Sequence, residues 1–297
     1  MNRVRIGYFG DGPWAHRALE ALLAEERVKV VFVCGRWQSE DEVLAAMARE
    51  AGIPFWVHPS INTGEFGERV ADAQTDLLIS MSFNQIFRQP LLNLPRIAAI
   101  NCHAGKLPFY RGRNILNWAL INDEREFGVT VHHIDEGVDT GDIILQETLP
   151  ITDEDDYGTL LQRAYPTCAE LVRRAVLELA EGSAQRIPQA SLHPVGSYCC
   201  GRGPGDEQLD WNQSSRDVFN FVRALRAPGP WARCSNRGEE MEVRRVEEIP
   251  EAPIYKGIPG AVLAREAGGF LVKTADSLVR LADWSGGGKL RVGDRLQ

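Results

Sequence analysis

Three residues able to move a proton and to stabilise an oxyanion lie in the middle of the chain. Asn101 and His103 are two residues apart at the end of an apolar strand-like run, so both side chains point to one side. An Asn amide can donate to an oxyanion, and a His exchanges a proton near neutral pH. Asp139 follows 36 residues after His103, in a turn, where a carboxylate can fix an imidazole tautomer. The set suits acyl transfer to an amine that attacks directly.

The types and spacing of these residues also allow simpler interpretations. A His at a strand end is often structural, and an Asp in an Asp-Thr-Gly-Asp turn can serve only to cap that turn. His132 and His133 are consecutive on an expected strand, so only one of them can face the site, and we expect no metal pair.

The elements around these residues predict an α/β fold. Apolar runs alternate with helical spacing, which is typical of a parallel sheet covered by helices on both faces and resembles a Rossmann-like domain. Sites in such sheets lie at the carboxyl ends of the strands. The expected strands are 4–9, 28–34, 77–80, 98–102, 128–133 and 143–146, and the expected helices are 15–23, 41–51 and 159–179, the last opened by four acidic residues at 153–156.

A Gly-rich stretch near 197–206 predicts a domain boundary. We expect a catalytic domain at 1–203 and a second domain at 204–297. The second begins with an amphipathic helix at 214–225, and short alternating segments then predict a small β-barrel or sandwich. Those segments are 242–246, 260–264, 269–274 and 277–282.

The charge of the chain limits its partners. The 297 residues carry 33 basic and 41 acidic groups, a formal charge of −8, which argues against sequence-independent binding along a phosphate backbone. Residues 1–206 hold 19 basic and 28 acidic groups, and residues 207–297 hold 14 and 13. No apolar run is long enough to cross a membrane and no signal peptide is evident. With six cysteines and no Cys-x-x-Cys pair, we expect a cytoplasmic protein with reduced thiols and no zinc.

The glycines at 10–12 invite a dinucleotide-binding interpretation. Pro13 and Trp14 crowd the turn, Ala15 stands at the third glycine position, and Cys34 rather than an acid closes the second strand. We therefore expect no NAD(P), and expect this loop, with Gly12 and Trp14, to shape the acceptor site.

Three motifs in this order resemble the 10-formyltetrahydrofolate-dependent formyltransferases. They are Asn-Cys-His at 101–103, Leu-Pro-Phe-Tyr-Arg-Gly at 107–112 and Asp-Thr-Gly-Asp at 139–142. Residues 210–230 resemble the start of the family's C-terminal domain, and 257–296 its OB-like barrel. The resemblance implies Asn101, His103 and Asp139 as catalytic residues and 10-formyltetrahydrofolate as co-substrate. It implies a folate pocket lined by Met81, Phe83, Gln85, Ile86, Asp135, Glu136, Gly137 and Val138.

The loop after the catalytic strand resembles the branch of the family that formylates nucleotide-linked amino sugars. Tyr110, Arg111, Arg113, Asn114 and Trp118 are the expected acceptor-binding residues there, with Arg suited to a phosphate. Methionyl-tRNA formyltransferase is the alternative, and only it would bring in nucleic acid. The C-terminal domain has three open roles: contacting the nucleotide, forming a homodimer, or neither.

Overall fold

A computed structural model describes residues 3–39 and 41–297, and the chain forms two compact units. The first unit comprises residues 1–112, 127–149 and 162–199. The second comprises 113–126, 150–161 and 200–297. Each unit therefore draws on segments that are far apart in the sequence, and each is described by itself below.

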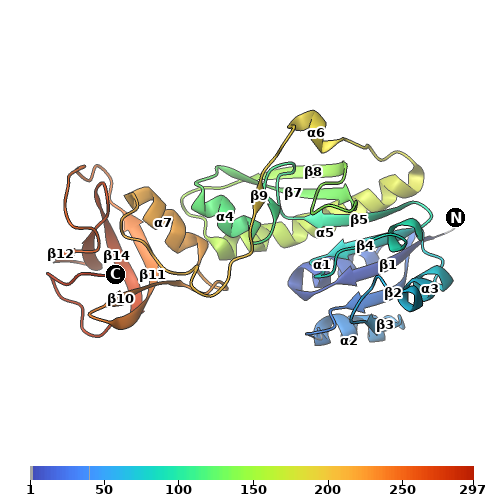
Figure 1. Cartoon of the computed structure of the whole chain (residues 1–297), viewed down its shortest axis with the longest axis horizontal. Helices are drawn as coiled ribbons and strands as arrows, with labels where there is room; N and C mark the ends of the chain where they lie inside the picture. Colours follow the sequence, from blue (N-terminus) through green and yellow to red (C-terminus); the bar gives the residue numbers. More distant parts are fainter. Residues whose placement is uncertain (1–2, 40) are drawn as a thin grey trace. The chain divides into compact units, whose positions relative to one another are not determined.

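A seven-stranded sheet forms the centre of the first unit (Figure 1). Its order is β3-β2-β1-β4-β5-β7-β8. The pairs from β3 to β5 are parallel, as predicted, but β7 runs antiparallel to β5, so the sheet is mixed. The strands are β1 (Val4–Gly10), β2 (Val28–Gly35), β3 (Phe55–Val57), β4 (Leu77–Met81), β5 (Ala98–His103), β7 (Glu126–His133) and β8 (Ile143–Pro150).

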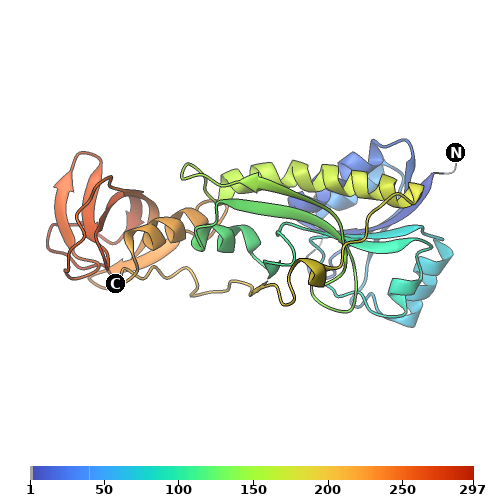
Figure 2. The ribbon, with the colours of Figure 1, turned by 90° about the horizontal axis from the view of Figure 1, so that it is seen from above.

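Helices cover this sheet on both sides. In Figure 2 the long helix α5 runs along one face and α3 lies on the other. Side-chain caps begin two of them, since Asp41 accepts from the Leu44 N–H and Thr63 from the Phe66 N–H. The helices are α1 (Gly12–Leu23), α2 (Glu42–Glu50), α3 (Gly64–Asp72), the 3-10 turn η1 (Leu91–Asn93), α5 (Tyr157–Glu181) and α6 (Gln189–Leu192).

The central strands are largely apolar, as expected of a sheet whose two faces are both covered by helices. All five residues of β4 are buried. An aromatic cluster fills the side on which α3 lies, with Phe9 in contact with Phe32, Phe66 and Phe87. A two-stranded pair, β6 (Arg111–Gly112) and β9 (Tyr198–Cys199), ties the loop after β5 to the segment after α6.

The second unit contains a five-stranded antiparallel sheet in the order β10-β11-β14-β13-β12. Its last residues bridge both edges, because Leu296 pairs with Asn236 of β10 and Arg295 pairs with Ala261 beside β12. The elements are α4 (Ile115–Ile121), α7 (Ser215–Ala224), β10 (Ala232–Asn236), β11 (Glu239–Glu248), β12 (Val262–Glu266), β13 (Gly269–Lys273) and β14 (Leu278–Gly286).

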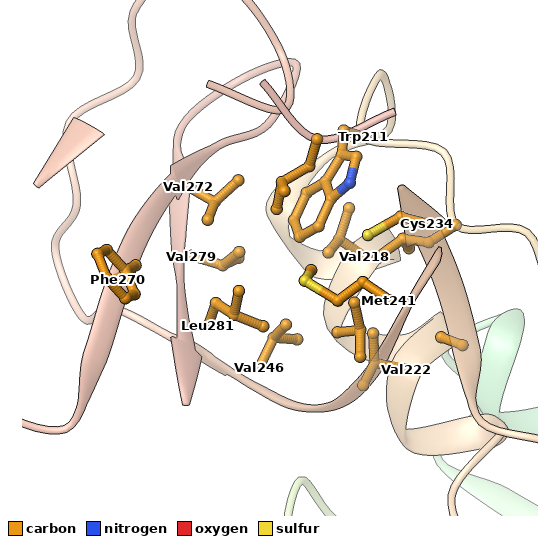
Figure 3. Close-up of a cluster of buried hydrophobic side chains, with 14 of the residues drawn as sticks. Trp211, Val218, Val222, Cys234, Met241, Val246, Phe270, Val272, Val279 and Leu281 are labelled. Atoms are coloured by element: carbon orange, nitrogen blue, oxygen red, sulfur yellow. The ribbon is translucent and has the colours of Figure 1, made fainter. Parts of the chain in front are cut away.

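The core of the second unit lies between α7 and this sheet (Figure 3). Val218 and Val222 of α7 face Met241, Val279 and Leu281 of the strands. All five are at most 1% exposed, so the unit has a dry aliphatic core.

Two predictions from the sequence are confirmed by these elements: the fold class and the acidic start of α5. The α/β domain precedes a C-terminal domain with an antiparallel sheet. The Asp156 carboxylate accepts from the Thr159 N–H in the first turn of α5, as expected of the acidic run. The six cysteines are free thiols. Among the described residues, no helix combines the length and the hydropathy needed to span a membrane.

Candidate active site

Asn101, His103 and Asp139 come together at the end of β5. The His103 Nδ1 atom lies 3.5 Å from Asp139 Oδ2, and the Asn101 Nδ2 atom lies 3.4 Å from Asp139 Oδ1. Asn101 and His103 reach the same carboxylate because they are two residues apart on one strand. The structure therefore brings together the three side chains that the sequence placed in one site.

The carboxylate of Asp139 is held from several sides. Its residue adopts φ +54° in the turn before β8, a left-handed conformation that Asp tolerates. Its Oδ2 atom accepts from the Gly112 N–H at 2.9 Å. Burial raises the pKa of this carboxyl, but His103, His132 and the Gly112 N–H outweigh it and hold the pKa well below its usual value. Asp139 is thus a fixed anion near neutral pH.

His103 is buried, with only 8% of the residue exposed. Its Nε2 atom donates to the Tyr110 carbonyl at 2.7 Å. Gly105 makes this contact possible, since a Cβ atom there would lie 2.4 Å from His103 Nε2 and 2.6 Å from the Tyr110 carbonyl oxygen. Burial and His132 lower the pKa of His103, and Asp139 and the Tyr110 carbonyl oppose them without cancelling the shift.

A second histidine also contacts this group. His132 is the cross-strand partner of Asn101 in the β5–β7 pair. Its Nε2 atom lies 3.1 Å from Asn101 Nδ2 and 3.5 Å from Asp139 Oδ1. From the sequence we expected one of His132 and His133 to face the site, but assigned neither a role there. Alternation along the strand shows that one of two consecutive histidines faces the site, but only the register identifies which one.

Arg111 is buried and is not the exposed phosphate-binding residue that the sequence suggested. The residue is 7% exposed, and its Nε and Nη2 atoms donate to the Gln189 side chain at 3.0 and 2.7 Å. Gln189 in turn donates to the carbonyls of Asp139 and Gly141, each at 2.8 Å. The guanidinium is therefore committed to partners that support the Asp139 turn. Gln189 had no motif to mark it in the sequence.

Two residues expected in the folate pocket are packed inside the first unit. Met81 is 1% exposed at the end of β4. The ring of Phe83 contacts that of Phe9, with centroids 5.4 Å apart.

The other two residues of that loop lie beyond the aromatic contacts. Gln85 binds the 58–61 segment, because it accepts from the Ile61 N–H and donates to the His58 carbonyl. Ile86 is 47% exposed. Of the four, it is the side chain best placed to meet a bound molecule.

The turn that leads to Asp139 exposes four of the expected folate-binding residues. Asp135 accepts from the Gly137 N–H and the Thr140 hydroxyl, so its side chain builds the turn. Val138 is 48% exposed. The remaining two, Glu136 and Gly137, are also exposed.

The glycine loop after β1 starts α1. Gly12 has φ +70°, and its N–H donates to the Asp41 carboxylate at 2.7 Å. The Trp14 ring meets Tyr165 edge-on, with centroids 4.6 Å apart. Asp41 also pairs with His16, so the loop is fixed by contacts inside this unit.

Tyr110 belongs to the first unit, whereas the last three expected acceptor residues, Arg113, Asn114 and Trp118, belong to the second. Tyr110 has φ +58° and its N–H donates to the Ser197 hydroxyl. In the second unit, Asn114 accepts from the Arg202 N–H and Trp118 donates to the Cys200 carbonyl. Arg113 is exposed. The contacts of these last three do not test their predicted role.

The described residues contain no group of three or more His, Cys, Asp or Glu side chains able to hold a metal ion. What the site offers is an amide donor, two imidazoles and a buried carboxylate. This set can stabilise an oxyanion and exchange a proton.

Comparison with known proteins agrees with this chemistry. The formyl transferase model matches residues 3–176, and the formyl transferase C-terminal domain matches 203–293. The chain therefore belongs to the formyl transferase family, and it is an enzyme that transfers a formyl group.

Relatives in sequence and in structure carry different names. The methionyl-tRNA formyltransferase of Pelotomaculum thermopropionicum is 29% identical, covering 99% of this chain and 95% of that protein. That of Halalkalibacterium halodurans is 33% identical over 76% of this chain and 70% of its own. An N-formyltransferase from Helicobacter canadensis, solved with folinic acid and dTDP-3-aminofucose, has a TM-score of 0.73 at 19% identity. That match covers 95% of this chain and all of the other, and it supports the fold alone.

Proposed function

We propose that Asn101, His103 and Asp139 transfer a formyl group from 10-formyltetrahydrofolate to an amine. The observation that carries this is the shared carboxylate, with the amide 3.4 Å and the imidazole 3.5 Å from its two oxygens. Such a donor set fits a reaction in which charge develops on a carbonyl oxygen and a proton changes place. The folate supplies the formyl group as a carbonyl bound to nitrogen.

In this mechanism the acceptor amine attacks the formyl carbon, forming a carbon–nitrogen bond. The Asn101 N–H stabilises the negative charge on the formyl oxygen, and so does His103 once it has taken a proton from the attacking amine. The bond to the folate nitrogen then breaks, and His103 passes the proton lost by the amine to that nitrogen. Because Nε2 donates to the Tyr110 carbonyl, Nδ1 is the nitrogen left for proton exchange, beside the Asp139 anion.

The folate is proposed to bind against the loop after β4 and the turn before Asp139. Met81, Phe83, Gln85 and Ile86 would line one side, and the 135–138 backbone the other. The exposed side chains of Ile86 and Val138 support this assignment, because apolar surface is available there for the pterin ring.

For the acceptor, we propose a nucleotide-linked amino sugar, bound by the loop that contains Gly12 and Trp14 and by Tyr110, Arg113, Asn114 and Trp118. The supporting observation is the charge of the C-terminal region. Of its 14 basic residues, at least eight already pair with acids of the same unit. A surface that binds tRNA phosphates instead needs basic side chains that are free to replace counterions.

Initiator tRNA is the second candidate acceptor. It is favoured by the similarity of both domains to methionyl-tRNA formyltransferases over 99% of the chain. Under this alternative the arginines of the second unit would exchange their acidic partners for phosphates on binding.

A formylation assay with the full chain and 10-formyltetrahydrofolate distinguishes the two. UDP-, dTDP- and GDP-linked amino sugars and methionyl-tRNA are offered separately, and thermal shifts record which acceptor stabilises the protein. We expect turnover with one sugar class and a KM that changes little between about 50 and 200 mM salt. Turnover with methionyl-tRNA alone, with affinity falling about 10³-fold or more over that range, would assign the tRNA function instead.

We also propose that residues 1–203 act as the catalytic domain and 204–297 as an accessory domain in a cytoplasmic enzyme. The first family match ends at residue 176 and the second begins at residue 203, and the free thiols fit a reducing compartment. A protein that ends at residue 203 should still bind folate, which calorimetry can measure.

A further inference from the structure

His132 touches two of the three proposed catalytic side chains but belongs to none of the motifs that identified them. It is 2% exposed, on β7, directly opposite Asn101 in the strand pair. Backbone pairing fixes the separation of the two residues, so the contact between their side chains is built into the sheet.

The contacts of His132 define its tautomer. Its Nδ1 atom lies 2.7 Å from the carbonyl oxygen of His133, which can only accept a hydrogen bond, so Nδ1 carries the proton. In the neutral ring the Nε2 atom then has a free lone pair, whereas only the protonated ring can donate to Asp139. That lone pair faces the Asn101 amide at 3.1 Å.

A lone pair can receive only the nitrogen end of an amide. The bond to His132 therefore determines which end of the Asn101 amide is the nitrogen and which is the oxygen. The shape of an amide alone does not distinguish the two. One N–H of Asn101 is used by His132. The other has only the longer 3.4 Å contact to Asp139 Oδ1, so it is the hydrogen that remains for a formyl oxygen.

We propose that His132 is a positioning residue that holds the Asn101 amide with its nitrogen toward the substrate. Without it, only the longer 3.4 Å contact with Asp139 opposes rotation of the amide. A rotated amide presents its oxygen, which repels a developing oxyanion. This inference rests on the proposed role of Asn101 in formyl transfer.

Two pairs of variants test this. His132→Leu removes the acceptor at similar volume, and His132→Asn keeps an amide whose oxygen ends short of Asn101. Both should lower kcat about 10- to 100-fold, less than the roughly 10²- to 10³-fold expected for Asn101→Ala. KM for folate and acceptor should change less than about 2-fold. His132→Gln, whose oxygen reaches the position of Nε2, should recover kcat to within about 5-fold of the wild type.

The neighbouring histidine supplies the matched control. His133 follows on the same strand, so its side chain points to the opposite face. His133→Gln and His133→Leu should leave kcat within about 2-fold of the wild type. Circular dichroism and Tm of each variant identify losses caused by unfolding, and the comparison of Gln with Asn at 132 stands even where Leu fails to fold.

A double-mutant cycle separates the inference from the function on which it rests. If His132 acts through Asn101, adding His132→Leu to Asn101→Ala should cost no further activity. Losses that multiply, or a His132→Gln variant as slow as His132→Asn, would overturn the positioning role. An Asn101→Ala variant with normal kcat would instead overturn the proposed function itself.

Discussion

The two units differ in how their buried polar side chains are grouped. The first unit encloses a polar group in which His103, His132 and Asp139 share contacts, and Arg111 with Gln189 supports it from behind. The core of the second unit is made mainly of aliphatic side chains with Trp211 and Phe270, and its buried Lys273 donates to the Thr274 and Ser277 carbonyls rather than to an acid. A buried polar group requires every partner in place, whereas an apolar core depends mainly on volume. Substitutions should therefore affect activity in the first unit and stability in the second.

The largest effect is expected for Asp139→Asn. The substitution keeps the shape of the side chain but removes the anion that faces both histidines, and kcat should fall about 10³-fold or more. Folate binding, measured by calorimetry, should survive. Asp142→Asn is the control, because Asp142 pairs with Arg186 at the surface of the same turn. Near-normal turnover of Asp139→Asn would contradict the expectation that substitutions in the first unit affect activity.

In the second unit, Leu281→Ala should affect stability instead. Leu281 is fully buried between the sheet and α7, so a cavity there should lower the free energy of unfolding by about 2–5 kcal/mol. Denaturant titration measures this loss, and kcat well below Tm should stay within about 3-fold of the wild type. Leu263, which is 38% exposed, supplies the control substitution. A large fall in kcat would show that the C-terminal core also governs the chemistry.

The pH dependence of stability should trace to the first unit. Burial lowers the pKa of His103, so the unfolded chain binds this proton more readily and stability rises with pH up to about 6.5. His103→Gln should flatten that rise by at most about 1.4 kcal/mol per pH unit, the slope of one proton. His133, whose pKa burial also lowers, keeps part of the slope. Equal slopes for the wild type and the variant would contradict the assignment.

The smallest effect is expected at Arg216. Its guanidinium pairs with Asp123, Asp153 and Glu248 at 2.6–2.7 Å within the second unit. Arg216→Met should lower the free energy of unfolding by about 1 kcal/mol in dilute buffer and by less in high salt, because salt screens exposed pairs. Arg17→Met, which breaks only an exposed pair with Glu20, should have no measurable effect. A loss at Arg216 that ignores salt would mean that packing on Phe219 dominates.

The sequence predicted most elements of the fold because periodicity is a local property. The run that ends at His103 and the expected strand at 128–133 correspond to β5 and β7. Periodicity does not predict the relative direction of these two strands, because strand pairing is decided by residues far apart in the sequence. The prediction of a parallel sheet was therefore right for β3 to β5 and wrong at β7.

The sequence predicted those residues of the candidate site that lie in recognisable motifs. Asn101, His103 and Asp139 have motifs and do meet. Arg111 has a motif as well, but its burial depends on Gln189, 78 residues further along the chain. No local sequence pattern near either residue predicts the contact between Arg111 and Gln189, because it results from long-range packing.

The path by which Gln189 supports the Asp139 turn has a consequence for making hybrid enzymes. The group around Asp139 draws on three separated stretches of chain, at 101–112, 132–141 and 189–198. A chimaera that takes only the first stretch from a relative joins the arginine and the N–H donor of one protein to the glutamine and the carboxylate of another. Exchanges aimed at a new acceptor should therefore move all three stretches as a single block.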